Sequence, residues 1–260
     1  MKCRVCGSEN LKLYYTQGYS HEYKFYRCQN CTLVNIDLSN LTIADHQDKY
    51  SIDLPDPRIR GKNTGAVLSI NYINEKLDNK GKMLDIGCGN GALLLYAQQS
   101  GWEVEGSELV ESIAKSVEDE LDIRVKVGDF MNGYDNETPF DLVTFRHVLE
   151  HIPDSVGVMN EIGRLLVPRG HAMLEFPNIE AMSLKYRRLL ANLGFKKKYA
   201  KGYQPGHCNE FCRESFTYLC EKTGFELLDW QTYSYTPLKN AIYKLFNTST
   251  KARVLVRKVN

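Results

Sequence analysis

Three glycines at alternate positions, Gly87, Gly89 and Gly91, separate two apolar stretches of this chain of 260 residues. Residues 82–86 before them predict a strand, and residues 92–97 after them predict the first turns of a helix. Glycine lets a backbone turn sharply and leaves no Cβ between it and a ligand. Because the free N–H groups of a helix N-terminus favour polar or anionic groups, the loop is expected to bind the charged end of a ligand.

The spacing of this loop does not decide whether the ligand is a dinucleotide or a cofactor of another class. A dinucleotide site of the nicotinamide or flavin type has the spacing G-x-G-x-x-G, whereas this chain has G-x-G-x-G. A structural turn that binds no ligand is a third alternative. The residues that follow the loop must therefore decide between these alternatives.

Acidic residues end the next two predicted strands. Residues 102–108 predict a second strand that ends in Glu108, where a carboxylate can accept hydrogen bonds from both hydroxyls of a ribose. Residues 124–129 predict a third strand that is closed by Asp129, and residues 140–154 predict a fourth strand that breaks into a loop and a helix. A single acid at a strand end can equally be solvated or cap a helix. Several such acids, each at the end of a predicted strand, are therefore needed to indicate a cofactor site.

Four passages in this order resemble one protein family. They are LDIGCGNG at the glycine loop, the acid that ends the second predicted strand, GDF at residues 128–130, and FDLVTFRHVLEHIPD at residues 140–154. Over roughly residues 65–233 the chain resembles the class I S-adenosylmethionine (SAM)-dependent methyltransferases. The resemblance implies an α/β fold with a doubly wound, Rossmann-like sheet, and SAM as the cofactor.

The resemblance also implies which residues bind SAM. The loop glycines and Asp85 meet the methionine part, and the backbone carbonyl at Arg146 faces the methionine ammonium. Glu108 holds the ribose, and Asp129 together with the backbone N–H of Phe130 meets the adenine. The implied cofactor-binding residues are therefore Asp85, Gly87, Gly89, Gly91, Glu108, Asp129, Phe130 and Arg146.

Two histidines are candidates for a general base. The methyl group of SAM is already activated, so the enzyme has to align the acceptor and, for a hydroxyl or an acidic carbon, remove a proton. Histidine suits that task near neutral pH. His147 follows the fourth strand, and His207 lies in the passage GHCNEF, which resembles a passage of the relatives. Either could be the base, or each could be a structural histidine, whereas Glu150 and His151 are assigned to the scaffold.

The start of the chain contains two C-x-x-C pairs, Cys3 with Cys6 and Cys28 with Cys31. Each pair can present two thiolates to one tetrahedral ion, and a segment of this size has too small a core to be stable without such a cross-link. We therefore predict a zinc ribbon at residues 1–40 that holds structural Zn²⁺. Disulfides are the alternative in an oxidising compartment, and a redox pair would need a thioredoxin-like strand and helix around it.

The composition indicates a soluble protein with one large domain and a small appendage. Hydrophobic residues make up 43% of the chain and charged residues 25%, and no apolar run approaches the length of a membrane span. The N-terminus carries cysteines where a signal peptide would need an apolar core. We therefore expect a cytoplasmic protein with no membrane span.

The rest of the chain is divided by its hydrophobic pattern. Residues 41–80 are expected to be a linker and a leading helix, with Tyr50 as a cover for the cofactor or a packing residue, and residues 81–260 are expected to form the methyltransferase domain. Two insertions above the strand ends are the predicted substrate lid, at about residues 179–205 and 236–250. The remaining predicted elements are helices at residues 155–167 and 213–223 and strands at residues 171–178, 225–233 and 253–259.

A zinc ribbon joined to such a domain resembles two groups of enzymes. One is the bacterial methyltransferases of sugar and cell-surface glycan pathways, and the other is the large-subunit rRNA guanine methyltransferases. The passage HVLEHIPD favours the first group, and a net charge of +1 argues against RNA. We therefore predict O-methylation of a small molecule or glycan, such as a sugar, a nucleotide-sugar or a surface polysaccharide component. A zinc-ribbon interaction protein without catalysis is a further alternative, against which the intact cofactor residues argue.

Positive charge gathers in the last third of the chain. Residues 179–260 contain 15 Lys and Arg but 6 Asp and Glu, and Lys196, Lys197 and Lys198 stand together in the first predicted insertion. A basic surface beside the site would attract an anionic acceptor. A solvated face that binds nothing is the alternative, and the sequence does not predict the oligomeric state.

Overall fold

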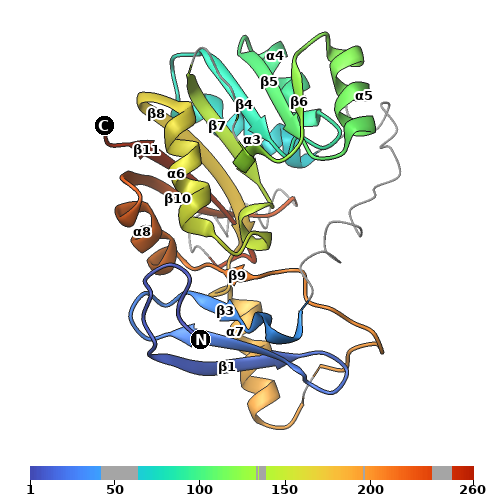
Figure 1. Ribbon diagram of the computed structural model, residues 1–260, viewed down its shortest axis with the longest axis vertical. Helices are drawn as coiled ribbons and strands as arrows, with labels where there is room; N and C mark the ends of the chain where they lie inside the picture. The colour runs from blue at the N-terminus through green and yellow to red at the C-terminus, as the bar shows by residue number, and fades with distance from the viewer. Residues whose placement is uncertain (42–63, 133, 135–138, 196, 236–247) are drawn as a thin grey trace.

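The computed structural model describes residues 1–41, 64–132, 134, 139–195, 197–235 and 248–260, so that Tyr50 lies outside the described residues. Figure 1 shows a large sheet flanked by helices and, at the N-terminal end of the chain, a smaller sheet below it. The two sheets meet near strand β9, which is a short strand from late in the chain.

The large sheet has seven strands in the order β10-β11-β8-β7-β4-β5-β6. Strands β4 to β8 pair in parallel, and β11 pairs antiparallel with both β8 and β10. Strand β4 reads KMLDI and is buried after its first residue, as expected for a strand that is covered on both faces. The strands are β4 (Lys82–Ile86), β5 (Glu103–Glu108), β6 (Val125–Val127), β7 (Phe140–Arg146), β8 (Leu166–Pro177), β10 (Phe225–Tyr233) and β11 (Lys251–Lys258).

The strand order reverses at β4. Strands β5 and β6 extend the sheet on one side of β4, whereas β7 and β8 extend it on the other side. In open parallel sheets a ligand binds outside the carboxyl ends of the strands at such a reversal. The fold therefore places the crevice at the ends of β4 and β7, where the glycine loop and His147 begin.

Helices cover both faces of the large sheet. One apolar cluster joins helices α3, α4 and α5 to one face, and a second joins α6 and α8 to the other face. The helices are α3 (Thr64–Lys76), α4 (Ala92–Gln99), α5 (Glu111–Leu121), α6 (Ser155–Leu165), α7 (Met182–Asn192) and α8 (Arg213–Lys222). Short 3-10 turns η1 (Leu38–Asn40), η2 (Phe130–Asn132) and η3 (Leu149–His151) follow β3, β6 and β7.

The small sheet is antiparallel and has the order β1-β2-β3-β9. Its first three strands come from the predicted zinc ribbon, but its last strand comes from residues 209–210. The sequence did not predict β3 or β9, because strands of three and two residues carry no readable alternation. The strands are β1 (Leu11–Gln17), β2 (Tyr23–Cys28), β3 (Val34–Ile36) and β9 (Asn209–Glu210).

The structure corrects one predicted boundary. Helix α6 ends at Leu165, and β8 starts directly after it, so that residues 168–170 do not separate the two elements as predicted. Instead, the pairing of β8 with β7 shifts register between the pairs Phe140 with Leu166 and Leu142 with His171. The extra residues form a bulge-like irregularity, which is one of the few places in a strand where proline is found.

The predicted lid is only partly described. Helix α7 lies within the first insertion and beside the small sheet (Figure 1). Of the second insertion, residues 236–247 lie outside the described residues. Among the helices that the structure describes, none is both long and apolar enough to cross a membrane.

Candidate functional site

The glycine loop has a backbone that requires glycine. Gly87, Gly89 and Gly91 have φ values of 70°, 52° and 69°, in the left-handed region that side chains disfavour. A Cβ at Gly91 would also lie 2.7 Å from Val117 Cγ1, which is closer than carbon atoms pack. The loop leads into α4 with Gly91 at its N-cap, so the N–H groups of the first turn face the crevice end of the sheet.

Glu108 is tied to this loop. The backbone N–H of Gly89 donates to Glu108 Oε2 over 3.0 Å, and the N–H of Val110 donates to Glu108 Oε1 over 3.1 Å. A carboxylate accepts about four hydrogen bonds, so these two contacts fix its position and leave lone pairs for a ligand. The structure therefore brings the loop and the predicted ribose-binding acid together.

Asp129 and Phe130 follow strand β6 at the same edge of the sheet. Asp129 is exposed, and its Oδ1 accepts a hydrogen bond of 3.0 Å from the N–H of Met131, which caps the η2 turn. The Phe130 ring is buried and packs edge-on against Phe145, with 5.4 Å between the ring centroids. The side chain of Phe130 thus belongs to the core, and the contact of its backbone N–H with the adenine stays a prediction.

A buried group of charges lies at the ends of β4, β7, β8 and β11. Thr144 Oγ1 donates to Asp85 Oδ1 over 2.6 Å, and Arg146 Nε donates to Glu175 Oε2 over 2.8 Å. The guanidinium of Arg253 donates to the other oxygen of Glu175. Arg146 was predicted for its backbone carbonyl, whereas its side chain turns out to hold Glu175. Glu175 and Arg253 were not predicted as site residues, although each is a charge inside an otherwise apolar strand.

The two buried acids in this group have opposite pKa shifts. Burial raises the pKa of Asp85 to about 6, and the charge of Arg146 and the Thr144 hydrogen bond only partly oppose this. Burial also opposes ionisation of Glu175, but the charges and hydrogen bonds of Arg146 and Arg253 outweigh it and lower the pKa to about 2. Glu175 is therefore a permanent anion, whereas Asp85 gains its charge near neutral pH.

The two candidate bases converge on Glu150. His147 Nδ1 lies 3.6 Å from Glu150 Oε1, and the His147 side chain is 37% exposed. The backbone N–H of His147 donates to the Glu175 carbonyl over 2.7 Å, and its φ of 56° turns the chain sharply at the end of β7. His207 comes from a segment 60 positions later in the sequence and stacks edge-on against His151, with 5.2 Å between the ring centroids.

His207 has a second carboxylate on its other side. Its Nδ1 lies 3.8 Å from Glu210 Oε1, while Glu210 Oε2 accepts a hydrogen bond of 2.6 Å from the Tyr15 hydroxyl of β1. Burial lowers the pKa of His207, but Glu210 and Glu150 outweigh it, so the pKa lies above the ordinary value of histidine. The two carboxylates thus stabilise the protonated form of His207 relative to that of a free histidine.

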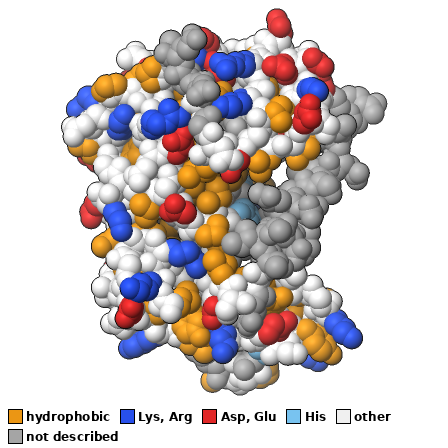
Figure 2. Space-filling view, viewed as in Figure 1, with side chains coloured by type: hydrophobic (Ala, Val, Ile, Leu, Met, Phe, Trp, Pro, Cys, Tyr) orange, Lys and Arg blue, Asp and Glu red, His pale blue; other side chains and the backbone are white. Residues whose placement is uncertain are grey.

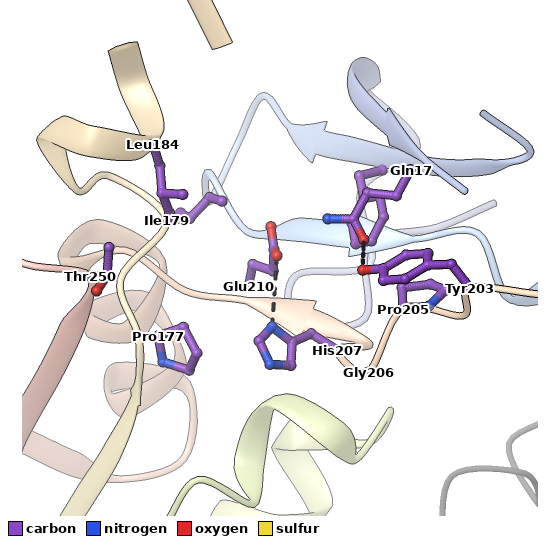
Figure 3. Close-up of a pocket in the computed structure, with 11 residues that line it drawn as sticks. Gln17, Pro177, Ile179, Leu184, Tyr203, Pro205, Gly206, His207, Glu210 and Thr250 are labelled. Atoms are coloured by element: carbon purple, nitrogen blue, oxygen red, sulfur yellow. Dashed lines mark hydrogen bonds and ion pairs between the residues drawn. The ribbon is translucent and has the colours of Figure 1, made fainter. Parts of the chain in front are cut away.

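A cavity of about 340 Å³ opens beside His207 (Figure 3). One wall comes from the small sheet and the segment before β9, where the Tyr203 hydroxyl donates to Gln17 Oε1 over 2.8 Å. The opposite wall comes from the end of β8 and the residues after it. The lining residues are Gln17, Phe25, Pro177, Ile179, Leu184, Tyr203, Pro205, Gly206, His207, Glu210 and Thr250.

The four predicted cysteine ligands lie together. The Sγ atoms of Cys3 and Cys31 are 3.4 Å apart, as are those of Cys6 and Cys28, and all four lie within 4.8 Å of one another. These distances are far longer than a disulfide bond and close to the separation of about 3.8 Å between thiolates on one tetrahedral zinc ion. Four free thiols in this arrangement fit Zn²⁺.

A set of mostly half-buried hydrogen bonds joins the cysteine module to the site. Arg4, between the first two cysteines, donates from Nε to Asn209 Oδ1 over 2.8 Å and from its terminal nitrogens to the carbonyls of Ile36 and Cys208. Asn209 Nδ2 in turn donates to the Ile152 carbonyl and to Ser155 Oγ, each over 2.8 Å. The segment that carries His207 is therefore held from both sides.

Known proteins resemble this chain over most of its length. Residues 64–229 match a family model described as a methyltransferase domain. The ubiquinone biosynthesis O-methyltransferase of Leptothrix cholodnii is 27% identical over 212 residues, which cover 74% of this chain and 84% of that protein. The protein of the same name from Coxiella burnetii is 29% identical over 180 residues, which cover 66% of this chain and 75% of that protein.

Solved structures share the fold. The Burkholderia thailandensis 1,6-didemethyltoxoflavin-N1-methyltransferase, solved with 1,6-didemethyltoxoflavin and S-adenosylhomocysteine, aligns with a TM-score of 0.60 at 17% identity over 95% of this chain and 100% of that chain. A SAM-dependent methyltransferase from Archaeoglobus fulgidus aligns with a TM-score of 0.54 at 17% identity, over 74% and 92% of the two chains. The predicted Rossmann-like fold and enzyme class are thus confirmed, and the chain belongs to the methyltransferase-domain family of SAM-dependent enzymes.

Proposed function

We propose that this enzyme transfers a methyl group from SAM to a hydroxyl group of a small acceptor molecule that occupies the cavity beside His207. The observation that carries the proposal is the position of this cavity, at the carboxyl end of β8 and lined by His207, whose ring stacks against His151 beside Glu150. When bound, SAM supplies an activated methyl group. The chain then has to bind SAM, align the acceptor and take up a proton.

We assign the binding of SAM to the residues at the ends of β4, β5 and β6. The loop glycines leave room for the methionine part, and the fixed carboxylate of Glu108 suits a ribose. Asp129, which is exposed, suits the adenine amine. Asp85 is placed to pair with the methionine ammonium, because it lies directly before the loop. A nearby ammonium would favour the charged form of this buried carboxylate, whose pKa burial raises.

We assign the removal of the proton to His147. A general base must be neutral before it acts, and the two carboxylates around His207 favour its protonated form. His147 stands at the end of β7 with part of its ring exposed and Glu150 beside it. Glu150 can therefore stabilise the imidazolium that forms when His147 takes up the proton.

The acceptor class rests on two kinds of support. Relatives named for O-methylation in ubiquinone biosynthesis favour a hydroxyl group as acceptor. The sugar or glycan acceptor that the N-terminal cysteine module suggested also carries hydroxyl groups. An anionic acceptor is not included, because the cavity residues that the structure describes include Glu210 but no Lys or Arg. Lys197 lies over the ring of Tyr199 instead, and residue 196 lies outside the described residues.

Incubation with radiolabelled SAM tests this proposal. Simple sugars and nucleotide-sugars, quinols and catechols, and total RNA would be offered separately, followed by mass spectrometry of the labelled product. Label in a hydroxyl of a sugar or of an aromatic ring supports the proposal and selects between the two acceptor groups. Label in RNA alone, or on a nitrogen, would refute it.

The pKa of Asp85 predicts how SAM binding depends on pH. Below about pH 6 Asp85 is protonated and cannot pair with the ligand's ammonium, so affinity should rise with pH by up to about tenfold per unit and then level off. Calorimetric titrations of SAM from about pH 5 to about pH 8 measure this. Asp85→Asn should bind weakly at every pH, and a wild-type affinity that is flat across pH 6 would contradict the pairing.

We also propose that Cys3, Cys6, Cys28 and Cys31 hold one structural zinc ion. Elemental analysis should give at least one zinc per chain. Cys6→Ser should lower the thermal midpoint, because the small sheet loses the cross-link that its core needs. Cys220→Ser, a buried thiol outside the cluster, is the control for loss of a cysteine. Zinc content that is the same in Cys6→Ser and the parent would exclude this site.

A further inference from the structure

We propose that Glu150, His151 and His207 bind a divalent transition-metal ion at the edge of the acceptor cavity. The three residues offer one carboxylate and two imidazole ligands, and their ligand atoms all lie within 4.8 Å of one another. Ligands of a tetrahedral ion with bonds of 2.0–2.1 Å lie about 3.4 Å apart, so side-chain shifts of one to two Å would close the site.

The first support is the state of Glu150. Its side chain is 2% exposed, and among the described residues its Oε2 has no hydrogen-bond partner. Oε1 points toward His147 Nδ1 at 3.6 Å and His151 Nε2 at 3.9 Å, both longer than a hydrogen bond. A buried carboxylate with so few partners is costly unless a cation satisfies it.

The second support is the way in which His151 is oriented. Its Nδ1 lies 2.6 Å from the carbonyl oxygen of Gly206, which can only accept, so Nδ1 carries the proton. Nε2 is then the nitrogen with the lone pair, and it is the one that faces Glu150. Metal-binding histidines are held in this way, with the outer N–H on a backbone carbonyl or a carboxylate.

The third support is the matching arrangement at His207. Its Nδ1 faces Glu210 Oε1 at 3.8 Å, and Glu210 is itself held by the Tyr15 hydroxyl. This separation is longer than a hydrogen bond, but it places a carboxylate on the Nδ1 side of His207, just as the Gly206 carbonyl lies on the Nδ1 side of His151. Both histidines come from segments that Asn209 and Arg4 fix to one another, so the ligand set is preorganised.

The ligand chemistry indicates the class of ion. Two imidazoles and one carboxylate suit Zn²⁺, Fe²⁺, Co²⁺ or Mn²⁺, whereas Ca²⁺ and Mg²⁺ prefer sites made of oxygen ligands only. Three protein ligands also leave a coordination position open, unlike the four cysteines. Because His207 lines the cavity, that open position can take a hydroxyl oxygen of an acceptor.

Cobalt binding to the full-length protein, with neither SAM nor acceptor present, tests the site. Metal content is first counted by elemental analysis, and Co²⁺ is then added to the purified, zinc-containing chain. We expect a second metal per chain, either present on purification or taken up as Co²⁺, with a visible spectrum that lacks thiolate-to-cobalt charge transfer. One metal per chain with no uptake of Co²⁺ would overturn the site.

Three variants locate the ion. Glu150→Gln, His151→Gln and His207→Gln should each weaken Co²⁺ binding by more than about tenfold while they keep the cysteine-bound zinc. His171→Gln, a partly buried histidine on β8, is the matched control and should bind Co²⁺ like the parent. If Glu150→Gln does not fold, His207→Gln decides, since this side chain is 34% exposed. Unchanged Co²⁺ affinity in His207→Gln would refute the assignment, whatever the outcome of the methyl-transfer assays.

Discussion

Replacing His147 with asparagine or alanine should lower turnover by about 10²–10⁴-fold, the usual contribution of a positioned general base. SAM affinity should stay close to that of the parent, because the side chain leaves the glycine loop and Glu108 untouched. Single-turnover rates with the acceptor found in the labelling experiment, together with calorimetry for SAM, separate chemistry from binding.

The choice of two variants controls for the backbone at this position. His147 has a φ of 56°, which asparagine tolerates better than alanine does. If loss of the base is the cause, both variants should be equally slow, and activity should not return in the asparagine variant. Near-full activity in both variants would mean that alignment alone drives transfer, or that the base lies elsewhere.

The largest expected effect on stability comes from Glu175. Glu175→Gln leaves Arg146 and Arg253 buried without the anion that both of them contact, which should cost about 3–5 kcal/mol of unfolding free energy. Urea unfolding monitored by circular dichroism measures this cost. Glu226→Gln is the matched control, because Glu226 pairs with Arg257 at the surface and should cost about 0–1 kcal/mol.

The pH dependence of stability gives a second measure of the same interaction. The pKa of Glu175 is lowered to about 2, so its stabilising effect is complete above the ordinary glutamate pKa of 4.5 and is lost as the pH falls toward 2. The parent should therefore lose stability in acid more steeply than Glu175→Gln does. If Glu175→Gln and Glu226→Gln lose similar amounts of unfolding free energy at neutral pH, the pairing of Glu175 with Arg146 and Arg253 does not stabilise the fold.

The sequence predicted the part of the site that is local along the chain. The glycine loop, Glu108 and Asp129 each lie at the end of a strand or within two residues after it, so spacing alone places them at one edge of a parallel sheet. The cysteine pairs were predicted for the same reason, because each pair is a single tight turn. The geometry of such motifs follows from residues that are close together in the sequence.

The parts that could not be predicted depend on pairing between distant segments. Glu175 meets Arg253 only because β11 inserts beside β8, and Glu150 meets His207 only because the segment before β9 folds back over the η3 turn. Glu150 and His151 were assigned to the scaffold since nothing near them in the sequence offered a third ligand. Asn209 gave no signal either, as its partners are mostly backbone carbonyls and one distant arginine.

The strand pairing of the small sheet affects how the protein folds during its synthesis. Strands β1 to β3 leave the ribosome first, but β3 pairs with β9, which is synthesised more than 170 residues later. Until then the outer edge of β3 has unpaired N–H and carbonyl groups, which in nascent chains invite pairing with other strands. We expect the cysteine module to stay incomplete through most of translation, and a fragment that ends before residue 209 to aggregate through this edge, whereas the whole chain folds only after β11 has also joined the large sheet.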